Sequence, residues 1–174
     1  MAPLFILVIS TILLRIVGWF GVKRFSSWRT AGLIGVVVMF LFTGATHFTG
    51  MKHDYAAMLP SPMSENLGII YLTGALQIAG AIGLLIPRTR TLAGIALALL
   101  LVAMFPGNVY AALNDIEFRG DAPTPLWLRT PIQLLFIGMV LWTSIKGYPE
   151  KATSPRIEGS AAGHEHPSRQ SAAS

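Results

Sequence analysis

Residues 92–113 read LAGIALALLLVAMFPGNVYAAL and contain no charged side chain. A helix rises about 1.5 Å per residue, so about 20 residues cross the roughly 30 Å hydrocarbon layer of a bilayer. This stretch is therefore long enough to span a membrane as one helix. Four more apolar stretches of comparable length accompany it, at residues 2–22, 31–48, 68–86 and 130–146. Together the five stretches predict an all-α, polytopic membrane helical bundle.

The composition of the whole chain supports this prediction. Of its 174 residues, 53% are hydrophobic and only 12% are charged, whereas soluble domains carry about 25% charged residues. The chain has no cysteine, which excludes thiolate nucleophiles, iron–sulfur ligation and cysteine-based zinc sites within it. The net charge of +5 does not indicate a nucleic-acid partner, because the basic residues lie between apolar stretches and form no single stripe.

The distribution of lysine and arginine predicts an orientation, because these residues accumulate on the cytoplasmic side of membrane proteins. Nine of them lie in the first connection, the third connection and the C-terminal segment. Only three lie in the second and fourth connections, even when Arg129 is included. This alternation predicts a multi-pass protein of the bacterial cytoplasmic (inner) membrane, with the N-terminus outside and the C-terminus in the cytoplasm.

Both ends of the chain carry expectations of their own. We interpret residues 2–22 as a retained helix and not a secretory signal, because no basic residue precedes them and no small-residue cleavage pattern follows. Residues 1–148 are then the membrane bundle. Residues 149–174 are rich in Pro, Ser, Gly and charged residues, which predicts a disordered cytoplasmic tail. We expect no metal at His164 and His166, because a mobile pair of imidazoles lacks further ligands.

Five short patterns recur in the order and spacing of a known family. They are GATHF at 44–48, LTGALQ at 72–77, GLLIP at 83–87, FPGNV at 105–109 and PLWLRTPIQ at 125–133. With them the chain resembles the DoxX-like family of small bacterial integral membrane proteins. The resemblance implies a four-helix membrane core, here preceded by one N-terminal transmembrane helix, and an association with quinone-linked redox systems. One branch of that family supplies a subunit of a thiosulfate:quinone oxidoreductase.

The chain departs from the family pattern at two positions. The family often has an acidic residue where this chain has Gln77, and commonly has alanine where it has Gly107. A glutamine neither gives up nor takes up a proton near neutral pH. We therefore expect Gln77 to form hydrogen bonds and not to relay protons.

Few polar side chains lie within the predicted spans, and each is unfavourable there unless it faces a partner or a wet cavity. In the predicted orientation, His47, Asn108 and Gln133 lie at similar depth near the outer side. Arg129 lies above them at the interface, and Gln77 lies deeper. We predict an outward-facing ligand-binding pocket with Gln77 as its floor. The alternative is that these side chains only join helices, each hydrogen bond contributing about 0.6 kcal/mol.

Three local features are also predicted. Thr130 is expected to cap a last helix whose first residue is Pro131. Residues 54–59 are expected to form a short interfacial helix over the mouth of the bundle. Arg15 is expected to extend toward the cytoplasmic interface.

Small residues repeat every four positions on two of the predicted spans. They are Ala75, Ala79 and Gly83 on one span, and Gly94 and Ala98 on the next. Such stripes allow helix backbones to approach closely, so they predict helix packing at these positions.

These observations favour a non-catalytic membrane protein that acts as an accessory or small-ligand-binding subunit. The expected partners are the lipid bilayer and a membrane or redox protein. The residues show no cofactor site, and quinone is the cofactor that the resemblance implies. Two alternatives remain open. One is a membrane oxidoreductase subunit whose partner carries the cofactor, and the other is a transporter of a small solute.

Overall fold

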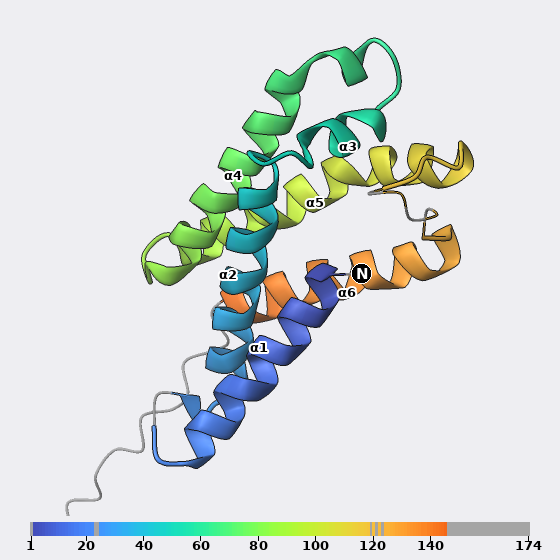
Figure 1. Cartoon of the computed structure of the whole chain (residues 1–174). Helices are drawn as coiled ribbons and strands as arrows, with labels where there is room; N and C mark the ends of the chain where they lie inside the picture. Colours follow the sequence, from blue (N-terminus) through green and yellow to red (C-terminus); the bar gives the residue numbers. More distant parts are fainter. Residues whose placement is uncertain (1, 23–24, 119, 121, 123, 146–174) are drawn as a thin grey trace, which may run out of the picture.

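The computed structural model describes residues 2–22, 25–118, 120, 122 and 124–145, and these form a helical membrane bundle (Figure 1). Five helices are long and apolar enough to cross a membrane: α1 (Ala2–Trp19), α2 (Trp28–Thr46), α4 (Leu67–Leu85), α5 (Arg90–Leu113) and α6 (Leu126–Ser144). The short helix α3 (Lys52–Ala57) and the 3-10 turn η2 (Met63–Glu65) connect α2 to α4. The prediction of an all-α multi-pass bundle is confirmed. The predicted tail, residues 149–174 with His164 and His166, lies outside the described residues.

The largest difference from the predicted bounds is at the start of α6. This helix begins at Leu126, so Pro131 lies inside it and Thr130 does not cap it. Pro125 stands before the helix with φ −64° and ψ 150°, and its carbonyl accepts the backbone N–H groups of Leu128 and Arg129. A proline in the second helical turn removes one backbone donor, and the apolar residues before it continue the helix. The prediction was wrong by about one turn.

The first two helices also differ slightly from their predicted bounds. Helix α1 ends at Trp19, three residues before its predicted limit. Gly21 follows with a φ of 117°, a conformation that residues with a side chain rarely adopt. Helix α2 begins at Trp28, three residues earlier than predicted. The first helix therefore ends before its apolar stretch does, and the second helix begins before its apolar stretch.

Helix α2 is the central element of the bundle. It packs against α1, α4 and α6, while α5 packs against α4 and α6. Helices α2 and α4 cross at two glycines, where a Cβ atom on Gly74 would lie 2.9 Å from the carbonyl oxygen of Gly44. Any side chain at this crossing would push the helices apart. The close crossing places His47, at the end of α2, next to the middle of α4, where Gln77 lies.

The core lies around α2, and the outer faces of the helices are apolar. Fully buried side chains come from four spans: Val36, Met39 and Phe40 on α2, Leu84 on α4, Leu97 on α5 and Val140 on α6. Helix α1 buries a single residue, Leu7, and exposes large apolar side chains along the rest of its length. In a bilayer these exposed side chains contact hydrocarbon.

The predicted stripe of small residues on α4 does not match the packing of the chain. Ala75 and Ala79 are exposed, and only Gly83 makes the expected close approach, with a Cβ position 2.8 Å from the Cβ of Ala93 on α5. The predicted stripe on α5 is confirmed, because Gly94 and Ala98 are buried and a Cβ atom on Gly94 would overlap Ser144 of α6. Helix α4 is apolar on every side, so its small residues alone do not mark the side that meets a neighbouring helix.

Arg15 reaches the end of the bundle to which it was predicted to extend. Its Nη1 donates hydrogen bonds to the carbonyls of Phe25 and Ser26 in the connection between α1 and α2. The guanidinium carbon lies 4.7 Å from the centroid of the Trp28 ring. The side chain thus joins α1 to the start of α2.

Candidate ligand-binding cavity

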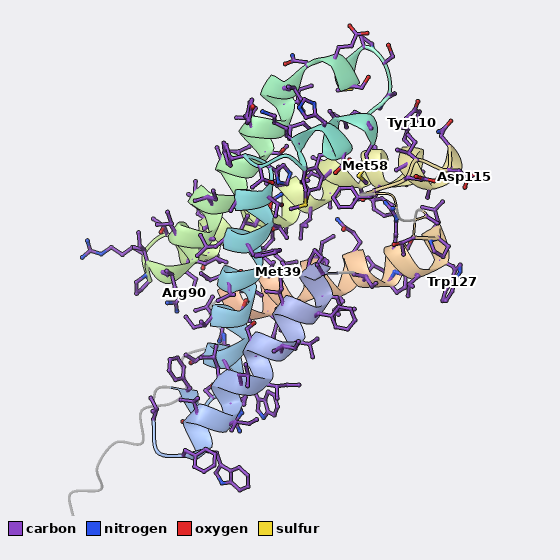
Figure 2. All side chains as sticks on the ribbon, viewed as in Figure 1. Met39, Met58, Arg90, Tyr110, Asp115 and Trp127 are labelled. Carbon is purple, nitrogen blue, oxygen red and sulfur yellow. The ribbon has the colours of Figure 1, made fainter. Side chains whose placement is uncertain are left out.

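A cavity of about 370 Å³ lies at the end of the bundle that carries α3 and the α5–α6 connection. Its wall is largely aromatic and aliphatic, with methionines such as Met39 on α2 and Met58 after α3, both labelled in Figure 2. All five residues predicted as site residues line it: His47, Gln77, Asn108, Arg129 and Gln133. Residues from the start of α1 contribute to the same wall. The structure therefore brings the five polar residues around one space.

Arg129 connects the first turn of α6 to α5 at this cavity. Its Nε donates to the carbonyl of Thr124 at 2.7 Å, and its Nη1 donates to the Asn108 side-chain oxygen at 3.1 Å and to the Asn108 carbonyl at 3.3 Å. Within the described residues its Nη2 has no hydrogen-bond partner. The guanidinium is thus held in one orientation, and the hydrogens of its Nη2 remain available as donors.

Gln133 forms a second link between α6 and α5, one turn further along α6. It lies about two turns into the helix, and not in the first turn as predicted, because α6 begins earlier. Its Nε2 donates to the carbonyl of Leu101 at 2.6 Å. The neighbouring carbonyl of Val102 lacks its helical donor, because Pro106 inside α5 has no N–H group. The Oε1 of Gln133 has no partner in the described part of the chain.

Gln77 lies deeper and is 4% exposed. Its Oε1 accepts a hydrogen bond from the Thr43 hydroxyl at 2.8 Å, and its Nε2 lies 3.5 Å from the sulfur of Met104. These contacts join α4 to α2 and to α5. Both groups that Gln77 contacts are neutral. Gln77 therefore acts as a hydrogen-bonding residue in the cavity wall, as predicted for a glutamine.

His47 is 2% exposed and immediately follows α2. Its Nδ1 lies 2.8 Å from the carbonyl oxygen of Thr43. A carbonyl oxygen can only accept, so Nδ1 carries the hydrogen, and Nε2 of the neutral ring is an acceptor. Nε2 is buried and has no partner among the described residues. His47 thus lines the cavity, while its Nε2 is an unused acceptor that is itself buried.

Helix α3 covers part of the cavity with one face. Met51, Tyr55 and Met58, spaced four and three residues apart, line the cavity together, as helical periodicity allows. The ring of Tyr55 stacks on His47 with centroids 4.3 Å apart and planes 10° apart. The predicted short helix is present, but it spans Lys52–Ala57 and ends before Leu59, because the residue before a proline is disfavoured in a helix.

Several residues at the cavity were not predicted from the sequence. The hydroxyl of Thr43 donates to Gln77, and its carbonyl oxygen contacts Nδ1 of His47. Thr43 lies four residues before His47, so these two residues share one face at the end of α2. Phe118 packs against Tyr55 with ring centroids 5.1 Å apart. The spacing of four residues between Thr43 and His47 is visible in the sequence and could have identified Thr43 as a cavity residue. The contribution of Ala2 and Pro3 from α1 has no local signal, because it depends on how α1 packs.

The residues at the cavity do not form a metal site. Across the described ranges, no group of three or more His, Asp or Glu side chains is arranged to hold a metal ion. The cavity offers amide, imidazole and guanidinium groups in an apolar wall. Such a wall suits an organic molecule.

Comparisons with known proteins place the chain in one family. No curated protein and no solved structure matches it. A family model matches residues 36–144, a segment that begins within α2 and ends with the last residue of α6, so α1 lies outside it. All five predicted site residues lie inside the matched segment. The chain belongs to this family, which is described as a domain of unknown function (DUF8561).

Proposed function

We propose that the chain is a non-catalytic membrane protein that binds a small amphipathic molecule in this cavity, as an accessory or ligand-binding subunit. One observation carries the proposal. Five polar side chains from α4, α5, α6 and the end of α2 surround one space of about 370 Å³ whose wall is otherwise mostly apolar. A few fixed polar groups in a concave apolar wall are typical of small-molecule sites.

The hydrogen bonds between helices also agree with a purely structural role for these residues. They leave capacity unused, however, at the Gln133 Oε1, the His47 Nε2 and the Arg129 Nη2 within the described residues. Of these three atoms only His47 Nε2 is buried, and an unsatisfied polar atom that is fully buried in hydrocarbon is unfavourable by several kcal/mol. Gln133 and Arg129 line the shared space with unused groups, which supports a site that a ligand or water completes.

The resemblance to the DoxX-like family remains part of the proposal. It supports a quinone as one ligand and a membrane redox protein as a partner. The wall contains phenylalanine and methionine side chains, which pack well against flat rings because aromatic faces stack and thioethers adapt their shape. The proposed role of the chain is to hold such a molecule for a partner that carries out the chemistry.

We also propose that the cavity opens on the outer side of the bacterial cytoplasmic membrane. The cavity is lined by His47 at the end of α2 and by Asn108 near the end of α5, whereas Arg29 and Arg90 lie at the starts of these two helices. Figure 2 shows Arg90 and Trp127 on opposite sides of the molecule. Basic residues accumulate on the cytoplasmic side. This orientation makes the ligand accessible from outside the cell or from the outer leaflet.

The test of the proposal is native mass spectrometry of the purified full chain together with an Asn108→Leu variant. We expect the wild-type chain to carry a small molecule of defined mass and the variant to retain about tenfold less, which is about 1.4 kcal/mol. Asn114→Leu is the matched control, because Asn114 is exposed at the end of the same helix and does not line the cavity. If all three proteins carried the small molecule to the same extent and N108L were only less stable, the proposal would be wrong and these residues would have a packing role alone.

A further inference from the structure

Arg129 is the charged side chain among the described residues that line the cavity. Among the described residues that line it, no aspartate or glutamate is present. The hydrogen bonds of Arg129 go to the carbonyl of Thr124 and to the carbonyl and side-chain oxygens of Asn108, which are all neutral acceptors. The guanidinium is therefore oriented, but its charge is not neutralised by a carboxylate of the described chain.

The position of Arg129 on α6 increases this positive potential. It lies in the first turn, where the unpaired N–H groups of a helix already carry a partial positive charge. The first turn of α6 contains no acidic side chain, as is also true of α1, α2, α4 and α5. It therefore supplies no carboxylate that would offset the charge of the guanidinium.

The unused hydrogen-bonding groups of Arg129 and Asn108 are donors, whereas the free Oε1 of Gln133, one turn further along α6, is an acceptor. The Nη2 of Arg129 has no partner in the described ranges, and the Nδ2 of Asn108 makes only a long 3.5 Å contact with the Met104 carbonyl. Both oxygens of Asn108 already accept from Arg129. A guanidinium with a free edge binds carboxylate and phosphate oxygens in a paired, charge-assisted geometry.

The wall changes character away from Arg129. Ile132, Gln133 and Phe136 follow it by three, four and seven residues, so they lie on the same face of α6, and all three line the cavity. Two of these three are apolar and none is charged. The cavity therefore has a positive, donor-rich end and a mostly apolar continuation along α6.

We infer that the ligand of this cavity is an amphipathic anion whose carboxylate or phosphate head binds Arg129 and Asn108 and whose apolar body lies along Ile132 and Phe136. The inference rests on the proposed function, because it assigns the charge and the head group of the ligand of that same site. A neutral quinone fits the proposed function but not this inference. Carboxylate and phosphate heads share the same chemistry, and a free single-chain acid and an anionic phospholipid are two sources of it.

The experiment measures binding of dodecanoate and dodecanol to the full chain in neutral phosphatidylcholine nanodiscs at pH 8, by titration calorimetry. The two probes share the alkyl chain, and only dodecanoate is ionised at that pH. We expect dodecanoate to bind at least tenfold more tightly, and Arg129→Gln to remove this preference, so that the variant binds the two probes with similar affinity. Arg129→Lys keeps the charge but loses the planar fork, so we expect an intermediate loss.

Arg90→Gln is the matched control. Arg90 also donates from its Nε to a backbone carbonyl, that of Leu84 at 2.9 Å, but it lies at the other end of the bundle and does not line the cavity. This variant should bind both probes as the wild type does. A second measurement needs no variant. Dodecanoate affinity of the wild-type chain should fall as salt increases from 0.05 to about 0.5 M, because salt screens charge pairs, while dodecanol affinity should not.

Two further arms distinguish the source of the anion. Dodecyl phosphate tests the phosphate head on a single chain, and nanodiscs that contain phosphatidylglycerol test a membrane lipid as competitor of dodecanoate. Competition that disappears in R129Q identifies the phospholipid as a source, and binding of the single-chain probes alone identifies a free acid. Equal affinity for dodecanoate and dodecanol, unaffected by R129Q and by salt, would overturn the inference. The proposed function would survive that result if a neutral molecule copurified with the chain.

Discussion

At the end of the bundle that carries Arg90, helices α4, α5 and α6 touch through small residues, whereas at the other end α5 and α6 enclose a cavity. A Cβ atom on Gly94 of α5 would overlap the side chain of Ser144 on α6. Further along α5 the corresponding positions hold Met104, Phe105 and Asn108, which line the cavity. Side-chain size along two helices therefore decides where the bundle is closed and where it is open.

The polar side chains of the two ends also use their hydrogen bonds differently. At the closed end, Thr143 donates to the carbonyl of Met139 on its own helix at 2.7 Å, and both its hydroxyl and that of Ser144 are spent within α6. At the cavity end, Arg129 and Gln133 donate across to α5 and leave groups unused within the described residues. At the closed end Thr91 of α5 also donates across to the carbonyl of Ser144 on α6, at 3.2 Å. The two ends therefore differ in the unused groups that remain at the cavity and not in whether hydrogen bonds join the helices.

The largest expected effect concerns which side of the membrane each end faces. A reporter fused after Lys151 should read as cytoplasmic, and one inserted near Asp121 should read as external, because basic residues concentrate at the Arg90 end. Alkaline phosphatase and fluorescent-protein fusions measure the two sides independently. If both reporters lie on the same side, five spans cannot all cross the membrane, and the cavity loses its proposed outward opening.

The closed end should be the more sensitive to added volume. Gly94→Ala places a methyl group where the fully buried Ser144 side chain lies, so we expect a loss of about 1–3 kcal/mol in unfolding free energy. Gly138→Ala on α6 meets no atom within 4 Å and should gain up to about 1 kcal/mol from helix propensity. Unfolding in mixed micelles, followed by circular dichroism, measures both. Similar values for the two variants would contradict the close packing at Gly94.

The sequence predicts the spans and the polar residues of the site, and the reason is the same for both. Length and apolarity are local properties, so each span can be recognised without knowing its neighbours. A polar residue such as Gln77 or Asn108 stands out inside an apolar stretch for the same reason. The predicted grouping of these residues at one depth follows from alternating helix direction, and the structure places them around one cavity.

The sequence predicts only in part which face of each helix meets another. The stripe of Gly94 and Ala98 on α5 is confirmed, because both residues are buried. Ala75 and Ala79 form a stripe that suits close packing, yet they are exposed, and α4 instead meets α2 at Gly74. The start of α6 was misplaced for a different reason. Pro131 is favoured at the first turn of a helix, but the helical pattern of the preceding apolar residues and Pro125 prevail over it.

The next effect separates binding from stability between the two ends. Gln133→Leu removes the hydrogen bond to the Leu101 carbonyl and the free Oε1, so we expect about tenfold weaker ligand binding and a stability loss of about 1 kcal/mol. Thr143→Val at the closed end removes only a bond within its own helix. That change should leave ligand binding unaltered and stability within about 1 kcal/mol. Native mass spectrometry and unfolding in micelles report the two quantities, and equal loss of ligand in both variants would contradict a site at the cavity end.

The smallest expected effect concerns α3, which covers the cavity. A six-residue helix has little stability of its own in water, so protection of its amides must come from tertiary contacts. These include the stack of Tyr55 on His47 and the hydrogen bond of 2.9 Å between the hydroxyl groups of Tyr55 and Thr46. Such aromatic pairs contribute about 0.5–1.5 kcal/mol, so Tyr55→Leu should speed deuterium exchange across residues 54–59 about two- to tenfold. Met63→Leu is the control, because Met63 is exposed and does not line the cavity. Ligand dissociation should accelerate in Y55L by a similar factor if α3 must open for release. Exchange of residues 54–59 in the wild-type chain at the rate of an unstructured peptide would mean that α3 does not stay docked, and the cavity would then be open on this side.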